Sequence, residues 1–257
     1  MNGRSPQDAF STPWDAPLVP DFPFTFRNVE ILTAFYRTDV EAVAALIPPP
    51  LEPASDIVAV HLYAMNDTEW LGVYNESAVQ VDVRLPERDL RGAYSPYLFL
   101  DNDGAISAGR ETYGQPKKYG RPTIDFRHDL IVGEVARNGI TFVTVTTPYK
   151  QRRSSVEEAR EIFDFVTNIN YKVVPDAAGG VAIRQLTARS LDDVRVQECW
   201  RGPATVELRP HAQAPVHRLP VRETLEGFYW RCDFTLDDAT VIHDYLRVGE
   251  RAAEASG

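Results

Sequence analysis

The most unusual segment of the chain, residues 109–122, reads GRETYGQPKKYGRP. It places three glycines and two prolines within 14 positions, a composition that excludes a regular helix or a central β-strand. We therefore expect a bent backbone with two adjacent lysines at its centre. In a regular strand, neighbouring side chains point to opposite faces, so Lys117 and Lys118 enter one pocket only if the chain is irregular there.

A lysine in such a bend suggests nucleophilic chemistry, provided that its amine is neutral. The pKa of free lysine is about 10.4, so only about one molecule in a few thousand is neutral at pH 7. Burial in an apolar pocket lowers this pKa, and so does a second cation nearby. Burial would therefore make a lysine of this segment, Lys117 or Lys118, competent as an amine nucleophile. The alternative is an exposed turn that happens to contain two lysines.

Outward from this segment, the sequence predicts strands more often than helices. Residues 57–65 form a nearly continuous apolar run, which predicts a strand buried on both faces. Residues 77–85 alternate between apolar and polar side chains, which predicts a half-buried strand. Further strands are predicted at 29–36, 97–100, 124–134, 140–148, 172–174, 182–187, 193–198, 205–208 and 226–236. This pattern favours a closed or sandwich-like β structure with a few peripheral helices.

Three short helices are predicted, and none of them divides the chain into two domains. Asp39 is a candidate N-cap of the first helix, and Ser155 with Glu158 matches a capping box at the second. The third should begin at Asp237, and Gly179-Gly180 should form a hairpin turn. We expect an irregular N-terminal arm over 1–22, one domain over 23–248 and a frayed tail over 249–257.

Composition limits the classes of ligand and partner. The formal net charge of the 257-residue chain is -10, which argues against nucleic acid as a partner but not against a small anionic substrate. Cys199 and Cys232 fit no metal motif and are expected to be buried free thiols. His211 and His217 lack an evident third ligand, so we expect no metal, and no cofactor fingerprint is present. The sequence shows no signal peptide and no apolar run of about 18 residues, so we predict a cytoplasmic protein without a membrane partner.

Blocks along nearly the whole chain resemble the acetoacetate decarboxylase superfamily. They are FRNVEILTAFYRTDVEAVAALIPPPLEP (26–53), AMNDTEWLGVYNES (64–77), YLFLDNDGAISAGRETYGQPKKYGRP (97–122), VQECWRGPATVEL (196–208), HAQAPVHRLPVRE (211–223) and VIHDYL (241–246). The resemblance implies a mainly β (α+β) fold, with an antiparallel β-barrel core and peripheral helices in one domain. It also implies a homo-oligomer that acts on a small keto acid.

The same resemblance assigns roles to several residues. It implies that Lys117 is the Schiff-base lysine, Lys118 its cationic neighbour and Glu76 the pocket carboxylate. Without the family, Glu76 would be interpreted as a solvated acid near the start of a strand. Arg110 and Glu111 also match the motif, and either a structural ion pair or a catalytic role is open to them.

Three departures from the family pattern bear on the reaction. Val29 stands where family decarboxylases have an arginine, His61 where they have a glutamate, and Gln115 where they have an aromatic residue. These changes favour a lysine-dependent aldolase–dehydratase acting on a 2-oxo acid such as pyruvate, with weak decarboxylation of acetoacetate. One alternative is a β-keto acid decarboxylase, and another is a non-catalytic binding module for small carboxylates. Gln115, His61, Val29, Arg110 and Glu111 are the candidate substrate-binding positions.

Overall fold

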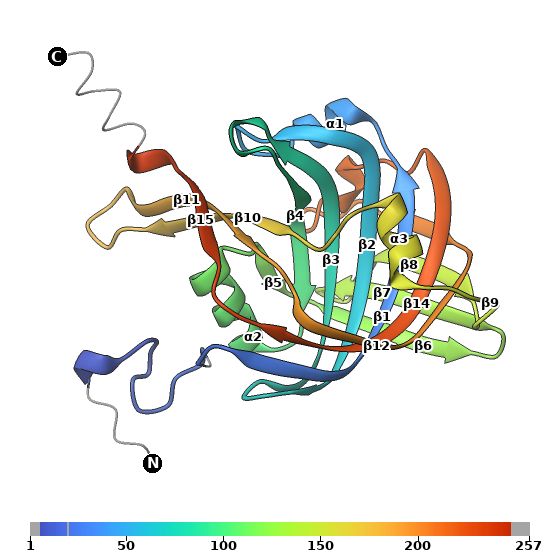
Figure 1. Ribbon diagram of the computed structural model, residues 1–257, viewed down its shortest axis with the longest axis horizontal. Helices are drawn as coiled ribbons and strands as arrows, with labels where there is room; N and C mark the ends of the chain where they lie inside the picture. The colour runs from blue at the N-terminus through green and yellow to red at the C-terminus, as the bar shows by residue number, and fades with distance from the viewer. Residues whose placement is uncertain (1–5, 20, 248–257) are drawn as a thin grey trace.

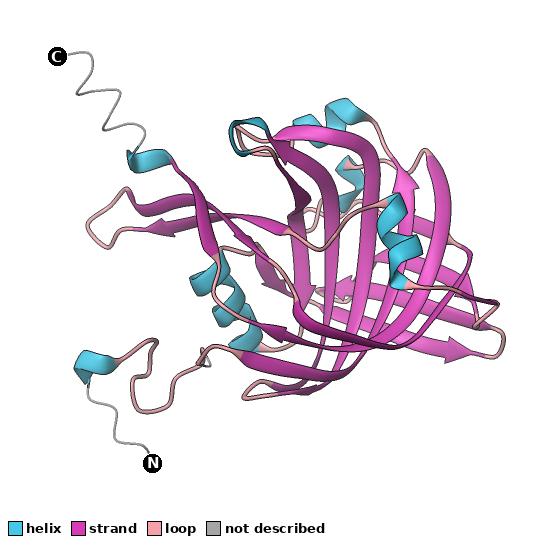
Figure 2. Ribbon diagram, in the orientation of Figure 1, coloured by secondary structure: helices cyan, strands magenta, loops and turns pink. Residues whose placement is uncertain are grey.

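The computed structural model describes residues 6–19 and 21–247, and most of these residues lie in β-strands (Figures 1 and 2). The strands are β1 (Phe24–Arg37), β2 (Glu52–Thr68), β3 (Gly72–Leu85), β4 (Leu90–Leu100), β5 (Lys117–Tyr119), β6 (Arg121–Arg127), β7 (Leu130–Arg137), β8 (Ile140–Pro148), β9 (Arg152–Arg153), β10 (Asn168–Pro175), β11 (Val181–Arg189), β12 (Asp192–Pro203), β13 (Thr205–Leu208), β14 (Glu223–Leu236) and β15 (Thr240–Asp244). The helices are α1 (Val40–Ala44), α2 (Asp103–Ala108) and α3 (Val156–Ile162), with a π-helical turn η3 (Gly109–Tyr113) and short 3₁₀ turns η1 (Pro6–Asp8), η2 (Pro86–Arg88) and η4 (Val216–Arg218).

The strands form two sheets. The large sheet has the order β15-β11-β10-β4-β3-β2-β1-β14-β12-β9, with β5 added beside β4, and the small sheet has the order β13-β8-β7-β6. Pairing is antiparallel except where β4 meets β5 and β10. The predicted mainly β class is confirmed; over the described residues the sheets do not close into a barrel, and the arrangement is the sandwich-like alternative. In the described part of the chain the large sheet is an open path from β15 to β9, and the small sheet packs against one of its faces instead of completing it.

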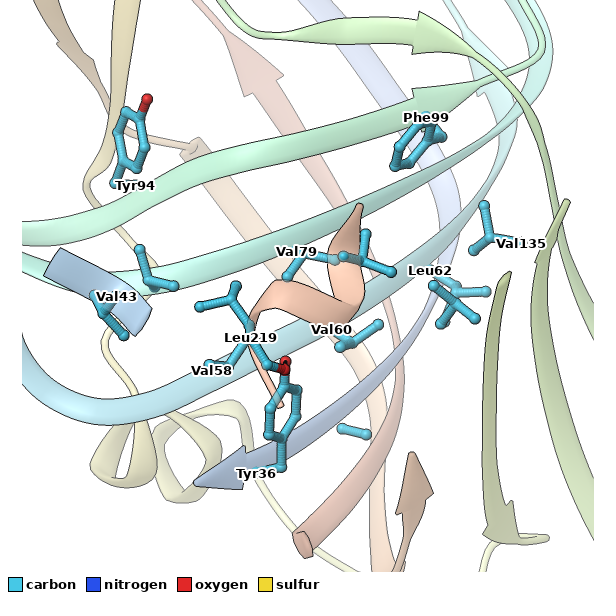
Figure 3. Packing of buried hydrophobic residues seen from close by; sticks show 14 of the residues in the cluster. Tyr36, Val43, Val58, Val60, Leu62, Val79, Tyr94, Phe99, Val135 and Leu219 are labelled. Carbon is cyan, nitrogen blue, oxygen red and sulfur yellow. Dashed lines mark hydrogen bonds between the residues drawn. The ribbon is translucent and has the colours of Figure 1, made fainter. Parts of the chain in front are cut away.

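The large sheet separates two hydrophobic cores. Along β1, Tyr36 points into a cluster shared with Val135 of the small sheet (Figure 3). Leu32 and Phe142 belong to the same cluster. Val29 and Phe35, on the other side of β1, belong to a second cluster beneath α2 and α3. Because both faces are covered, the strand predicted at 57–65 is buried on both sides, as expected.

The prediction that residues 77–85 form a half-buried strand is corrected by the structure, because both faces of the large sheet are covered here. Its polar positions were expected to face solvent, but β3 is buried on both faces over nearly this whole stretch. Gln80 and Asp82 are 5% and 1% exposed, respectively. The alternating pattern therefore marks polar groups inside the protein, and Asp82 is paired there with Arg91.

The helix predictions have mixed outcomes. Ser155 caps α3 as predicted, since its Oγ accepts a hydrogen bond from Glu158 N at 3.3 Å. Asp39 precedes α1, but its carboxylate pairs with Arg222 instead of capping the helix. The helix predicted from Asp237 is wrong, because residues 240–244 form β15 at the open edge of β11, where backbone hydrogen-bonding groups are available.

The remaining structural predictions concern turns, termini and thiols. Gly179 and Gly180 lie in the turn between β10 and β11 with positive φ, and Cys199 and Cys232 are buried free thiols, as predicted. The described part of the N-terminal arm contains only the turn η1, while the tail predicted over 249–257 lies outside the described residues. None of the helices in the described ranges is long and apolar enough to cross a membrane.

Candidate functional site

The segment 109–122 has the bent backbone that its composition predicts. Helix α2 continues directly into the π-helical turn η3, which ends at Gly114 with φ +78°. A Cβ atom at Gly114 would lie 2.3 Å from Lys172 Cα, so the position requires glycine for space as well as for conformation. The chain then enters β5, where Lys117 pairs with Leu98 of β4.

Lys117 lies inside the protein beside a carboxylate. Its side chain is 8% exposed, and its Nζ atom lies 3.0 Å from Oε2 of Glu76, which projects from β3. Gly109 makes room for this side chain, since a Cβ there would lie 2.5 Å from Lys117 Cδ. The structure thus brings together two of the residues that the sequence singled out, Lys117 and Glu76.

The surroundings of Lys117 favour its neutral form. Burial lowers the pKa of Lys117, and this effect is the largest of those acting on the amine. Glu76 opposes it by charge attraction and a hydrogen bond, while the positive charge of Arg189 adds to the lowering of the pKa. Desolvation therefore outweighs the carboxylate that touches the amine.

A cavity with about 650 Å³ of space not filled by protein atoms, including its opening to solvent, surrounds the amine. Its apolar wall includes Phe24, Phe26, Met65, Tyr74, Phe234 and Leu236. Its polar lining consists of Lys117, Glu76, Gln115, Gln80, Ser95, Asn168 and Arg189, together with the hydroxyl groups of its tyrosines. A mostly apolar cavity with a few convergent polar groups is typical of a small-molecule site.

Arg189 is the residue that sequence reasoning missed. It lies at the end of β11, with its guanidinium 5.0 Å from the ring centre of Tyr113. Its Nε atom is buried without a hydrogen-bond partner, and none of the ion pairs among the described residues involves this side chain. Nothing in the local sequence marks this position, because only the pairing of β11 with β10 brings it to the cavity.

Lys118, expected as the cationic neighbour of Lys117, lies elsewhere. It is exposed, and its Nζ donates to the backbone oxygen of Gln213 at 3.2 Å. Adjacent strand positions point apart, and β5 is regular enough for this rule to apply. The cation that lowers the pKa of Lys117 comes from Arg189.

Arg110 and Glu111 flank the site without lining the cavity. The Nη1 atom of Arg110 donates to the backbone oxygen of Lys117 at 3.3 Å, which braces the strand that holds the lysine. Glu111 accepts a hydrogen bond from the hydroxyl of Ser107. The two side chains therefore have separate partners and do not form the ion pair with each other that was one of the alternatives.

The three departures from the family pattern lie in different surroundings. Gln115 lines the cavity and is 4% exposed. Val29 is completely buried in the second hydrophobic cluster and does not line the cavity. His61 lies next to the cavity, where burial lowers its pKa to about 3, so its ring is neutral at physiological pH.

Over residues 6–19 and 21–247, no group of three or more His, Cys, Asp or Glu side chains is arranged to hold a metal ion.

The β fold holds a buried lysine–glutamate pair in a mostly apolar cavity. This arrangement is typical of proteins that bind a small molecule beside a reactive lysine. The model of one family, described as acetoacetate decarboxylase, matches residues 8–246, and the chain belongs to that family. The acetoacetate decarboxylase of Clostridium acetobutylicum is 36% identical over 92% of this chain and 96% of its own length. A solved acetoacetate decarboxylase structure superimposes with a TM-score of 0.88 at 34% identity, covering 93% of this chain and 97% of its own.

The comparisons support the decarboxylase alternative better than the aldolase–dehydratase that the sequence favoured. The enduracididine biosynthesis enzyme MppR, solved with a condensation product of pyruvate and an aldehyde, matches with a TM-score of 0.75 but only 17% identity. That likeness concerns the fold alone, whereas the relatives near 35% identity are named acetoacetate decarboxylase. The preference for an aldolase–dehydratase gave Val29 too much weight, since Val29 lies outside the cavity and Arg189 supplies a cation within it.

Proposed function

We propose that this protein decarboxylates a small β-keto acid through a Schiff base on Lys117. The observation that carries the proposal is the Lys117 amine, buried in an apolar cavity, with a lowered pKa and with Glu76 at 3.0 Å. Curated relatives 35% and 36% identical to this chain, both named acetoacetate decarboxylase, support this reaction.

The reaction begins with attack of the neutral amine on the ketone carbon. Loss of water gives a protonated imine, which is an electron sink adjacent to the carbon that bears the carboxylate. The bond to the carboxylate then breaks, CO₂ leaves, and the electron pair moves into the imine to give an enamine. The enamine carbon takes up a proton, and water hydrolyses the resulting imine to release the ketone and the free amine.

Two side chains have distinct tasks in this scheme. Glu76 carries protons, because its carboxylate already contacts the reacting nitrogen and is within reach of the departing hydroxyl. Arg189 attracts the anionic keto acid and helps to keep Lys117 neutral before the substrate reacts. Gln115 is a neutral donor and acceptor in the lining, suited to hold a carbonyl or a water molecule.

Borohydride trapping tests the proposal. Acetoacetate plus borohydride should add one reduced ketone-derived group to the peptide that carries Lys117, and CO₂ release should be measured in parallel. Lys117→Arg, which keeps the charge but removes the nucleophile, should abolish both signals. Lys118→Arg makes the same change at the exposed neighbouring position and should retain both.

Three outcomes would contradict the proposal. Trapping at another lysine would remove Lys117 from the reaction. Binding of keto acids without trapping or CO₂ release would support the non-catalytic binding module instead. Trapping with pyruvate and condensation with an aldehyde, but no CO₂ from any β-keto acid, would restore the aldolase–dehydratase.

We also infer that the chain forms a homo-oligomer, as the family resemblance implies. Val194 and Val196 are 42% and 43% exposed on β12, and Val241 is 44% exposed on β15, so apolar side chains are available at the surface. Light scattering coupled to size-exclusion chromatography should give a mass that is a multiple of 28.9 kDa. A monomer at micromolar concentration would contradict this inference.

A further inference from the structure

A second cavity, which we call the side chamber, adjoins the cavity around Lys117. The walls that it does not share are Ile31, His61, Phe165, Val166 and Trp230. The walls common to both cavities are Tyr63, Gln80, Asn168, Arg189 and Leu191. The side chamber contains about 410 Å³ of space between protein atoms, including any opening. The side chamber therefore lies directly beside the cavity that holds the Lys117 amine.

Two polar atoms in the walls of the side chamber have no hydrogen-bond partner of normal geometry. They are Nε2 of His61 and Oε1 of Gln80, in side chains that belong to residues 1% and 5% exposed. Burial of an unsatisfied polar group is unfavourable, so each atom favours a ligand that completes its hydrogen bonding. A long hydrogen bond between the side chains of His61 and Gln80 opposes the burial-driven fall in the pKa of His61, so the two polar groups face each other.

The hydrogen bonds around His61 indicate which of its two ring nitrogens carries the proton. Trp230 Nε1 donates to Thr33 Oγ1 at 3.5 Å, and Thr33 Oγ1 lies 2.8 Å from His61 Nδ1. Because Trp230 already donates to Thr33 Oγ1, we assign the hydroxyl proton of Thr33 to the contact with Nδ1. Since the ring is neutral, Nδ1 accepts and the remaining proton is on Nε2. His61 thus presents an N–H donor to the chamber.

Gln80 presents the complementary group. Its Nε2 donates to Ser95 Oγ at 3.1 Å, which leaves Oε1 as a free acceptor. Ser95 also accepts from Asn168, so the amide is held within a short polar network. A donor and an acceptor side by side match a hydroxyl group, which accepts from the first and donates to the second. A carboxylate would be repelled by the partial negative charge of the Gln80 oxygen, and it has no proton to donate to that oxygen.

We propose that the side chamber binds the substituent on the far side of the ketone and selects a substituent that carries an uncharged hydroxyl group. This substrate class, a hydroxyl-bearing β-keto acid, rests on the decarboxylase function proposed above. The rings of His61 and Phe165, with centres 5.4 Å apart, and the nearby ring of Trp230 enclose the hydrocarbon part of the substituent. His61 is a specificity residue in this arrangement, and Thr33 is a positioning residue that fixes its donor.

Matched substrate pairs test the proposal on the wild-type protein. 5-Hydroxy-3-oxohexanoate is compared with 3-oxohexanoate, and 4-(4-hydroxyphenyl)-3-oxobutanoate with 4-phenyl-3-oxobutanoate, by CO₂ release. At least one hydroxyl-bearing acid should exceed its partner in kcat/KM by about 10-fold or more, because the site leaves two polar atoms unpaired when the hydroxyl is missing. Equal kcat/KM values within both pairs would mean that the chamber holds only water, and they would overturn the proposal.

Substitutions test whether the residues of the side chamber cause the preference for hydroxyl-bearing acids. Gln80→Leu and His61→Phe should reduce the ratio of kcat/KM within the preferred pair toward one, and Thr33→Val should reduce it partly. Gln197→Leu makes the same change as Gln80→Leu at an exposed position of β12 and should preserve the ratio. Trapping of acetoacetate on each variant reports whether the Lys117 site is still assembled.

The outcomes separate the two proposals. CO₂ release from acetoacetate without any preference for hydroxyl-bearing acids overturns the substrate class alone. A preference that survives both Gln80→Leu and His61→Phe, in variants that still trap acetoacetate, also overturns the assignment to this chamber. If no β-keto acid is decarboxylated or trapped, the proposed function is wrong and the substrate class is rejected with it.

Discussion

Lys117 occupies the space that a side chain on Gly109 would fill. The Cδ and Cε atoms of Lys117 lie 2.5 and 2.6 Å from the position of a Cβ on Gly109, and Oε1 of Gln115 lies 2.7 Å from it. These separations are far below van der Waals contact, so even one methyl group at Gly109 must displace the lysine or the glutamine. The glycine at the start of the π-helical turn therefore sets the course of the reactive side chain.

Gly109→Ala should reduce trapping and CO₂ release by about 10²-fold, the typical effect of a displacement near 1 Å at a reacting group. The variant should still fold, because the clash involves a flexible side chain. Gly202→Ala is the matched control, since its new Cβ would lie 3.1 Å from the end of the Gln151 side chain and 3.4 and 3.5 Å from Pro148 Cδ and Thr147 Oγ1, which are ordinary contacts. Normal activity in Gly109→Ala would show that the position of the amine is not so restricted.

The pH dependence of the reaction should respond in opposite directions to the two charges near Lys117. The amine reacts when neutral, so kcat/KM rises as the pH increases through the pKa of Lys117. Arg189 lowers this pKa and Glu76 raises it. Arg189→Gln should therefore move the acidic limb of the profile to higher pH, and Glu76→Gln should move it to lower pH as well as slow proton transfer. Shifts of the same sign in both variants would contradict the electrostatic assignment.

Lys118→Gln should leave the acidic limb almost unchanged. The Lys118 side chain is exposed and bonded to Gln213, and charges in solvent are strongly screened. The informative measurement is the direct comparison of the limb in Lys118→Gln and Arg189→Gln. A larger shift in the Lys118 variant would show that Lys118, and not Arg189, is the cation that controls the nucleophile.

Replacing the buried pair by uncharged residues should stabilise the protein while abolishing its activity. The double substitution Lys117→Met with Glu76→Gln removes a buried carboxylate and a buried amine that is unfavourable to protonate, which should stabilise the protein by about 1 kcal/mol or more. Lys117→Met alone should destabilise by roughly 3–5 kcal/mol, because Glu76 stays buried without its partner. Denaturant unfolding of both variants and the wild type measures these differences.

The pH dependence of this stability gain has a defined sign. The pKa of Lys117 is lower in the folded protein than its value of 10.5 in an unfolded chain, so the unfolded state binds more protons between the two values. The buried Lys117 amine destabilises the folded wild type most at pH values below its own pKa in the folded protein. This destabilisation disappears as the pH rises toward 10.5. The advantage that the double variant owes to Lys117 should therefore be present at pH 7 and diminish in alkaline solution.

How much of the site the sequence predicts depends on how local each feature is. The bend, Lys117 and Gly114 lie within one short segment, and Gly and Pro at fixed positions constrain the backbone there directly. Glu76 was placed through the family motif, and the register that sets it opposite Tyr63 gives that placement a structural basis. Lys118 was misplaced because its distance from the amine depends on whether β5 is regular, which composition alone does not determine.

Arg189 and Gln80 could not be found in the same way. Arg189 reaches the cavity through pairing with Asn168, 21 positions earlier in the chain, and Gln80 had the polar character expected of an exposed strand position. Nothing in the alternation of residues 77–85 reveals that a second layer covers the polar face. The open sheet has the same origin: strand patterns predict strands, but not whether the last strand closes on the first.

The two faces of the large sheet differ in how freely their side chains can be substituted. The cluster that contains Leu32, Tyr36 and Phe142 lies behind the sheet and holds the two sheets together, whereas His61, Gln80 and Gln115 face the opposite side. Exchanging these polar side chains leaves the packing between the sheets untouched. Such a scaffold is evolvable: new substrates can be accommodated by substituting polar side chains of the cavity, while apolar clusters on both faces hold the sheets and helices in place.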